Sequence, residues 1–362
     1  MNINERLREL SLPDPLVMNN GKRAATKEDI LLRRKEIKEL LEYEIYGKIP
    51  SPPDHLSAEV TGIDKTFAGG KAYLYTLRFR ATFGEEVTYF QVKSVVPNRA
   101  GRLPAIVYLT DTEDIPNKFL PAEEITDRGY ALFLLNVKEI APYGIGTRFH
   151  DGLARHLSPG RRSAGSPGKL AMWAWGAMRV MDYLEKQPTV NKDNIAVSSH
   201  GVLGISALIA GGYDERFKYI IANCAGLLGT AISREKLGEP PESLIEGCPT
   251  LFSKRFLQNT KPFKKRSYDQ NFLLFLALDR HLLVGSAELD TRGDARGEFL
   301  ALASLYEAMS ILDKDGKLPK LKAPRKNEPL TLGKVSYHLR PGCEYFSRDD
   351  WNIYLDYIDK NL

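Results

Sequence analysis

Apolar segments that alternate with helix-like segments constrain the fold of this chain more than any other feature. Residues 104–110 (PAIVYLT) and 130–137 (YALFLLNV) are almost continuously apolar. A strand needs this composition when helices cover both faces of its sheet, as in parallel sheets. Helix-like segments follow, among them residues 170–187, 297–309 and 349–362. The order predicts repeated βα units around a mostly parallel sheet, which is an α/β fold.

Two other patterns precede these units. Residues 26–29 (TKED) provide a helix cap, and apolar residues then recur at helical spacing until a glycine and a proline end the pattern. We therefore expect residues 1–60 to form an amphipathic helical arm packed on the core, and residues 61–362 to form a single domain. From residue 72 to 97 the apolar period changes to two around an FGEE turn, which predicts an antiparallel entry hairpin.

Composition excludes several classes of protein. The 362 residues carry 51 basic and 46 acidic side chains, a net charge of +5, and the longest basic run is KPFKKR at 261–266. Nucleic-acid binding needs a clustered basic stripe, which the sequence lacks. Cys224, Cys248 and Cys343 have neither disulfide-framework nor zinc-site spacing, so we expect no metal or other cofactor. Without an apolar run of ~20 residues or a leader-like start, we expect a cytoplasmic protein that does not bind membranes.

The sequence NIAVSSHGVLGISALIAGG, residues 194–212, is typical of a strand, a tight turn and a helix that begins near Leu203. In α/β-hydrolases such a turn presents the nucleophilic serine between small residues, because neighbouring backbone crowds the site. Here Gly201 occupies the central position. Together with the entry hairpin and the βα units, the turn predicts an α/β-hydrolase fold with helices on both faces of the sheet.

Further segments occur in the same order as in one known family and span nearly the whole chain. They are LPDPLVM, YEIYGKIP, MWAWGAMRVMDYLE, DERFKYIIAN, AISREKLGE, SAELDTRGDARGEFLA and YHLRPGCEYFSRDDW. Through these segments and the turn, the chain resembles the glucuronoyl esterase-like carbohydrate esterases, whose bacterial relatives are often called acetyl xylan esterases. The resemblance implies an α/β-hydrolase fold and an ancestry in the cleavage of plant polysaccharide esters.

The resemblance also implies that the nucleophile is missing. Members typically show G-H-S-R-L-G-K at the turn, and this chain reads SHGVLGI from Ser199 to Ile205. The family serine, which attacks the ester carbonyl, corresponds to Gly201. The arginine that helps hold the oxyanion corresponds to Val202, and the lysine that contacts the sugar corresponds to Ile205. We expect Val202 and Ile205, with the adjacent His200, to lie at the ligand site.

The resemblance implies loss of the catalytic base as well. The family histidine follows the last strand in a pattern like R-P-G-G-H-D-L-T, and Glu344 stands in its place. The family acid is retained as Asp290, whereas a nearby tryptophan of the family is replaced by Arg292, which is expected at the ligand site. Some members carry the acid after an earlier strand, near Cys224 here. Asp290 therefore has no histidine to orient, and a serine without a base is a poor nucleophile.

Two relocated arrangements would keep the chain active. In the first, Ser198 or Ser199 acts with His200, although adjacent residues of a strand point to opposite faces. In the second, Asp290 and Glu344 share a proton or bind a cation.

Simpler interpretations compete with both arrangements. Buried structural serines compete with the first, and an ion pair from Glu344 to Arg292 or Arg340 competes with the second. Residues 148–169, a glycine-rich basic segment, are expected to be a solvated loop, with binding of an acidic sugar as the alternative. The tryptophans at 173, 175 and 351 fit helix packing better than a sugar platform.

The function predicted from sequence is that of a catalytically degenerate carbohydrate-esterase homologue. Its ancestral cleft would hold a carbohydrate or an acidic ligand in a binding or regulatory role. The alternative function is that of an active carboxylic-ester hydrolase, acting on acetyl or glucuronoyl esters through relocated groups.

Overall fold

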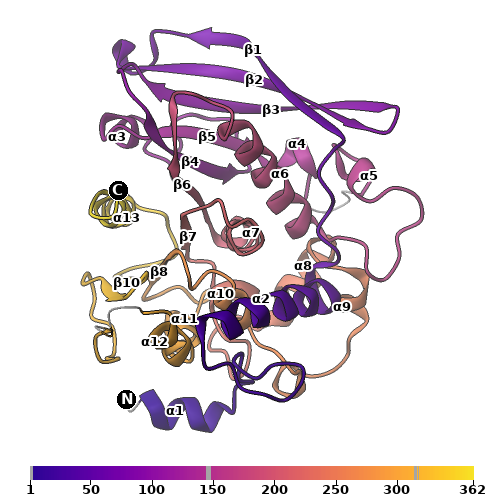
Figure 1. Ribbon diagram of the computed structural model, residues 1–362, viewed down its shortest axis with the longest axis vertical. Coiled ribbons are helices and arrows are strands. Elements are labelled where there is room, and N and C mark those ends of the chain that lie inside the picture. The colour runs from indigo at the N-terminus through magenta and orange to yellow at the C-terminus, as the bar shows by residue number, and fades with distance from the viewer. Residues whose placement is uncertain (1–2, 144–147, 314–315, 317) are drawn as a thin grey trace.

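A ten-stranded mixed sheet runs through the molecule (Figure 1). The computed structural model describes residues 3–143, 148–313, 316 and 318–362. The strands are β1 (His55–Asp64), β2 (Ala72–Phe83), β3 (Glu86–Pro97), β4 (Leu103–Thr110), β5 (Ala131–Asn136), β6 (Val190–His200), β7 (Tyr219–Asn223), β8 (His281–Ala287), β9 (Leu330–Leu332) and β10 (Val335–Arg340). Their order in space is β1-β2-β3-β5-β4-β6-β7-β8-β10-β9. Each pair of adjacent strands in the series β5-β4-β6-β7-β8-β10 is parallel, which confirms the predicted mostly parallel sheet.

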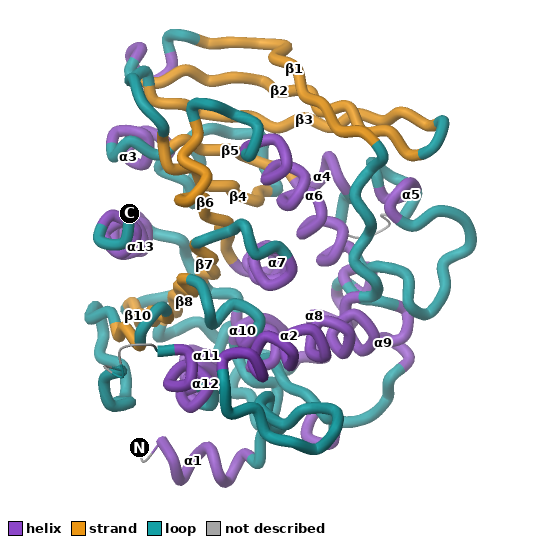
Figure 2. The backbone as a smooth tube through the Cα atoms, in the orientation of Figure 1, coloured by secondary structure: helices purple, strands orange, loops and turns teal. Residues whose placement is uncertain are grey.

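Helices cover both faces of the sheet (Figure 2). They are α1 (Ile3–Leu10), α2 (Lys27–Leu41), α3 (Ala122–Asp127), α4 (Val137–Ile140), α5 (Ala154–Leu157), α6 (Lys169–Leu184), α7 (Gly201–Tyr213), α8 (Pro241–Gly247), α9 (Lys254–Gln258), α10 (Asn271–Phe275), α11 (Ala295–Ala303), α12 (Tyr306–Leu312) and α13 (Arg348–Asp359). Side chains of α6, α7 and α10 belong to one apolar core, and those of α3 and α13 to another. Trp173, Trp175 and Trp351 are at most 1% exposed, so they serve helix packing as expected.

The N-terminal helices pack on the first of these cores. Thr26 caps α2 reciprocally with Asp29, and Ile30 and Ile37 are buried. The arm is shorter than the sequence predicts, because β1 begins at His55 and pairs with β2. The prediction placed that part of the chain in the arm because β1 is an edge strand with mostly exposed side chains, so it lacks the alternation that marks a half-buried strand.

The strand, turn and helix predicted at residues 194–212 form β6 and α7. The helix begins at Gly201 itself, two residues before the predicted start at Leu203. Small residues allow α7 to approach the sheet closely, since a β-carbon at Gly211 would lie 2.2 Å from the Ile220 side chain on β7. Because α7 begins directly after β6, its first turn lies at the carboxyl ends of the parallel strands, where α/β folds place their functional sites.

Each helix in the described part of the chain is too short or too polar to cross a lipid bilayer.

Candidate functional site

The turn between β6 and α7 has Gly201, the predicted nucleophile position, at its centre. Gly201 has φ of +56°, in the left-handed region that residues other than glycine adopt only with strain. His200, the residue before it, lies at the end of β6 and is partly buried. A β-carbon at position 201 would lie 3.3 Å from Oε1 of Glu344. The structure therefore brings Gly201 and Glu344 together, as expected from the family resemblance, with only a hydrogen atom as the side chain of Gly201.

Glu344 lies in the loop after β10, between the His200 imidazole and the Arg292 guanidinium. Its Oε1 is 3.4 Å from Nε2 of His200, and its Oε2 is 3.9 Å from Nη1 of Arg292. Its side chain is 30% exposed. The His200 imidazole lowers the pKa of Glu344 below its usual value, while burial opposes this effect and Arg292 and Lys118 add to it. The predicted pairing with Arg292 is present, and His200 is the closer partner.

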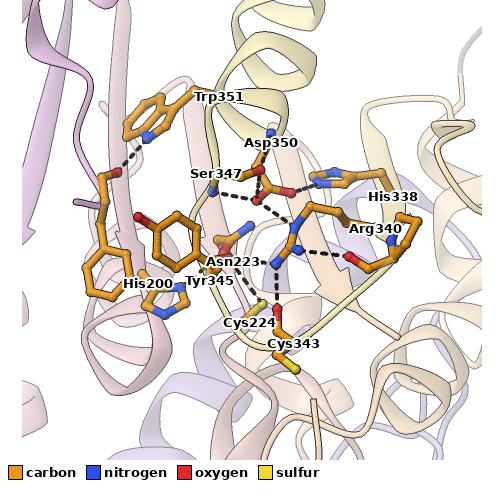
Figure 3. Close-up of polar contacts among 12 residues, drawn as sticks. His200, Asn223, Cys224, His338, Arg340, Cys343, Tyr345, Ser347, Asp350 and Trp351 are labelled. Atoms are coloured by element: carbon orange, nitrogen blue, oxygen red, sulfur yellow. Dashed lines mark hydrogen bonds and ion pairs between the residues drawn. The ribbon is translucent and has the colours of Figure 1, made fainter. Parts of the chain in front are cut away.

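The loop that carries Glu344 is anchored by a buried polar network (Figure 3). Asp350 on α13 is 1% exposed and accepts hydrogen bonds from His338 at 2.8 Å and Arg340 at 3.1 Å. Ser347 caps α13 through Asp350. Arg340 also donates to the carbonyl oxygen of Cys343 at 2.7 Å, and this bond ties the loop to the end of β10 (Figure 3). Burial raises the pKa of Asp350, but its bonds with His338 and Ser347 bring it below the ordinary value.

Asp290, the predicted acid, lies near the site but turns inward. Its Oδ1 accepts backbone hydrogen bonds from Arg292 at 2.9 Å and Gly293 at 2.8 Å. Its Oδ2 is buried and has no hydrogen-bond partner among the described residues. Burial raises the pKa of Asp290, and the charge of Glu344 raises it further. Asp290 and Glu344 are thus electrostatically coupled, but the free oxygen of Asp290 has no access to solvent.

The two serines before the turn are structural. Ser199 is 1% exposed and donates to the carbonyl oxygen of Leu109 at 2.7 Å. Ser198 is fully buried. His200 turns its Nδ1 toward Oδ1 of Asn223, 3.0 Å away, and not toward either serine hydroxyl. These contacts favour the interpretation of Ser198 and Ser199 as buried structural residues.

The other predicted ligand-site residues differ in how exposed their side chains are. Arg292 is 47% exposed and pairs with Glu239 at 3.2 Å, so its guanidinium is available beside Glu344. Val202 is partly buried at the start of α7. Ile205 is 1% exposed, and its side chain fills the space beside Gly229. Ile205 is therefore too buried to contact a ligand, contrary to the role that the resemblance implies.

Cys224, which occupies the alternative acid position, is a buried thiol. Its backbone has φ of +46°, and its Sγ lies 3.7 Å from the carbonyl oxygen of Tyr345. Burial raises the pKa of this thiol well above its usual value, so it cannot replace the carboxylate.

Aromatic residues that the sequence did not mark as site residues cover His200. The ring of Phe119, from the loop after β4, lies 4.7 Å from the imidazole, and Tyr345 packs on Phe119 at 5.2 Å. The Tyr345 hydroxyl donates to the carbonyl oxygen of Lys118 at 2.7 Å. Beside this cover, the residues from Asp111 to Phe119 line an open hollow of about 630 Å³. No local pattern predicts this arrangement, because it joins loops that are more than 200 residues apart.

A fully buried carboxylate lies beneath the site. Glu298 on α11 accepts hydrogen bonds from the hydroxyls of Thr230 and Ser286. Burial raises the pKa of Glu298 to about 8, with the two hydroxyls opposing the shift. In the described residues, no three His, Cys, Asp or Glu side chains are arranged to hold a metal ion.

Comparisons with known proteins agree with the predicted resemblance. A family profile described as "Glucuronyl esterase, fungi" matches residues 80–309. A carbohydrate esterase from an unknown prokaryotic organism is 29% identical over 97% of this chain and 90% of its own length. A 4-O-methyl-glucuronoyl methylesterase from Thermothelomyces thermophilus is 27% identical over 83% of this chain and 72% of its own. A solved glucuronoyl esterase from Solibacter usitatus, 29% identical, superimposes with a TM-score of 0.86 over 96% of this chain and 97% of that one.

Proposed function

Because the chain belongs to the glucuronoyl esterase family, we propose that it is a degenerate member that binds a carbohydrate ligand without cleaving an ester bond. One observation carries this proposal. The positions of nucleophile and base face each other at 3.3 Å, measured from the β-carbon site of Gly201 to Oε1 of Glu344, yet neither residue can perform its family role. Gly201 has no hydroxyl to attack a carbonyl carbon, and the loss of one triad member costs on the order of 10⁴ to 10⁶ in turnover.

Glu344 is a poor substitute for a catalytic histidine. A general base works best when its pKa lies near the working pH. The pKa of Glu344 is lowered by His200 and Arg292, so the carboxylate holds a proton even less well than an ordinary glutamate at neutral pH. It would therefore activate a water molecule weakly.

The relocated arrangements lack access to a substrate. Ser198 and Ser199 are at most 1% exposed, and Asp290 is 6% exposed with its unpaired oxygen buried. A nucleophile or general acid must come within hydrogen-bond distance of the reacting group, about 2.6–3.2 Å. None of these three side chains offers that approach without local opening of the structure.

The proposed ligand is a carbohydrate, by analogy with relatives whose names include carbohydrate esterase and 4-O-methyl-glucuronoyl methylesterase. Glu344 and Arg292 remain 30% and 47% exposed, so they can hydrogen-bond to sugar hydroxyls. The hollow beside Phe119, about 630 Å³, has the size of a small-molecule site. These features support retention of a binding surface after the loss of the reacting groups.

Active-site labelling together with a hydrolysis assay tests the proposal. We expect a fluorophosphonate to label no serine, and methyl glucuronate and p-nitrophenyl acetate to hydrolyse at the rate of buffer. Isothermal titration with methyl glucuronate should still detect binding, which Arg292→Gln should weaken. Stoichiometric labelling of one serine, or hydrolysis well above the buffer rate, would overturn the proposal in favour of the active esterase.

A further inference from the structure

Positive charge is concentrated in α9 and in the loop that follows it, residues 254–265. Within residues 254–265, five of twelve side chains are Lys or Arg and none is acidic, whereas the net charge of the whole chain is +5. The four lysines are exposed and the arginine is half-buried. These cations are Lys254, Arg255, Lys261, Lys264 and Lys265.

Within the described residues, these five cations are not neutralised by carboxylates, unlike several arginines elsewhere on the surface. Arg23 and Arg128 each contact two carboxylates, and Arg216 contacts three. None of the five cations in residues 254–265 forms an ion pair with a carboxylate in the part of the chain that the structure describes. Like charges held close together repel one another, and the field of such a patch speeds the approach of an oppositely charged ligand.

An exposed aromatic ring lies within this basic surface. Tyr43, just after α2, is 57% exposed, and the Arg255 guanidinium stacks on its ring at 3.7 Å from the centroid. The backbone N–H of Arg255 donates to the carbonyl oxygen of Ala164 at 2.9 Å, and that of Ser253 donates to Ile45 at 3.0 Å. The Ser253 bond holds α9 against the residues after α2, the Arg255 bond holds it against the loop of Ala164, and α9 lies beside the end of α2 in Figure 1. Tyr43 and Arg255 are therefore a preformed pair and not two independently moving side chains.

The chemistry of the pair selects a kind of ligand. A fixed guanidinium binds a carboxylate, and an exposed aromatic ring packs against the apolar face of a sugar ring. The surrounding lysines add charge that a chain of repeating carboxylates can use but a single small anion cannot. An acidic polysaccharide supplies sugar rings and repeated carboxylates together.

We propose that Tyr43, Arg255 and the exposed lysines of residues 254–265 form a surface site for an acidic polysaccharide, separate from Gly201 and Glu344. The choice of a carbohydrate rests on the proposed function, because it assumes that the chain still meets the polymers of its family. The site also gives a role to Ala164 and its neighbours in the basic loop, which hold Arg255 in place.

Affinity electrophoresis in gels that contain glucuronoxylan tests this site. The wild-type protein should be retarded by glucuronoxylan, but not by the same polymer after reduction of its carboxyl groups, and 0.5 M NaCl should weaken the binding. Lys264→Gln with Lys265→Gln should reduce affinity about fivefold. Tyr43→Ser should also reduce it. A matched control is Lys186→Gln with Lys192→Gln, which removes the same charge from exposed positions elsewhere and should leave affinity unchanged.

The outcomes separate this proposal from the proposed function. Equal retardation of the two double variants, or no retardation of the wild type, would overturn the surface site. Tighter binding to single-stranded DNA or to anionic lipid vesicles than to glucuronoxylan at equal charge would overturn its assignment to a polysaccharide. Ester hydrolysis by the wild type would overturn only the proposed function, since the surface residues take no part in it.

Discussion

The proposed reacting positions and the polar network behind them differ in their burial and in their hydrogen bonding. Asp350 and His338 are buried and are hydrogen-bonded to each other behind the loop of Glu344, and Asp350 also pairs with the partly buried Arg340. In front of the loop lie the two proposed reacting positions, Gly201, which has no side chain, and Glu344, which is 30% exposed. The difference teaches that stability and the proposed chemistry depend on different side chains, even where these side chains meet at one loop.

Free energy explains this difference. Removing one partner from a buried charge pair leaves an uncompensated buried charge, which costs about 3–5 kcal/mol. A reacting serine or histidine at a partly exposed position contributes little to folding. Replacing a single residue of the supporting network therefore costs folding stability, whereas replacing a reacting residue costs little.

Loss of Asp350 should have the largest effect. Asp350→Ala should lower the free energy of unfolding by about 3–5 kcal/mol, because His338 and Arg340 lose their buried acceptor. Urea unfolding followed by circular dichroism measures this change, with the exposed Asp356→Ala as control. A loss below about 1 kcal/mol would mean that the network is not what holds the loop.

Glu298 should make stability depend on pH. Its pKa is raised from 4.5 to about 8, so the unfolded chain releases the proton near pH 4.5 while the folded chain keeps it. Its contribution to stability is complete below pH 4.5 and is lost as the pH rises to about 8. Glu298→Gln should therefore be more stable than the wild type at pH 8, by a few kcal/mol, on the order of 1.4 kcal/mol per pKa unit.

Thermal unfolding between pH 4 and pH 8 checks the Glu298 prediction. The exposed Glu242→Gln should leave the pH slope of the wild type unchanged. A Glu298→Gln variant whose stability follows the same slope as the wild type would contradict the prediction.

Restoring the reacting groups should sharpen the comparison. The combined substitutions Gly201→Ser, Val202→Arg and Glu344→His should raise hydrolysis of p-nitrophenyl acetate at least about tenfold over wild type, equivalent to about 1.4 kcal/mol. The matched control carries Gly201→Ala in place of Gly201→Ser and lacks only the hydroxyl. A folded triple variant that is no faster than this control would mean that the supporting network does not preserve a usable site.

The strained turn should respond to a methyl group alone. Gly201→Ala should destabilise the fold by about 1–2 kcal/mol, because φ of +56° is unfavourable for any residue with a β-carbon. Gly247→Ala is the control, since that glycine has open space around it and no positive φ. Equal stability of the two variants would show that the turn relaxes at no cost.

Glu344→Gln should have the smallest effect, below about 0.5 kcal/mol at pH 7, because its ion pairs are partly exposed. The lowered pKa of Glu344 means that its contribution is present above the ordinary value of 4.5 and disappears as the pH falls through the folded value. Unfolding at pH 7 and pH 3 measures this. A larger difference between the proteins at pH 3 than at pH 7 would reverse the assigned sign.

The sequence alone determined the fold, and it predicts the site positions through the family resemblance. Continuous apolar strands, the capping residues of α2 and the form of the β6–α7 turn are local patterns, and the order of family segments predicts the site roles of Gly201, Asp290 and Glu344. These patterns can be recognised in the sequence, because each depends on residues that are close in the chain.

Only the tertiary structure decided how those positions are occupied. It places His200 beside Glu344, covers the imidazole with Phe119, and buries Ile205 against Gly229. It also pairs Arg255 with Tyr43, more than 200 residues away. These contacts depend on which loops meet at the edge of the sheet and on which face of a helix is covered, and no local pattern in the chain encodes either.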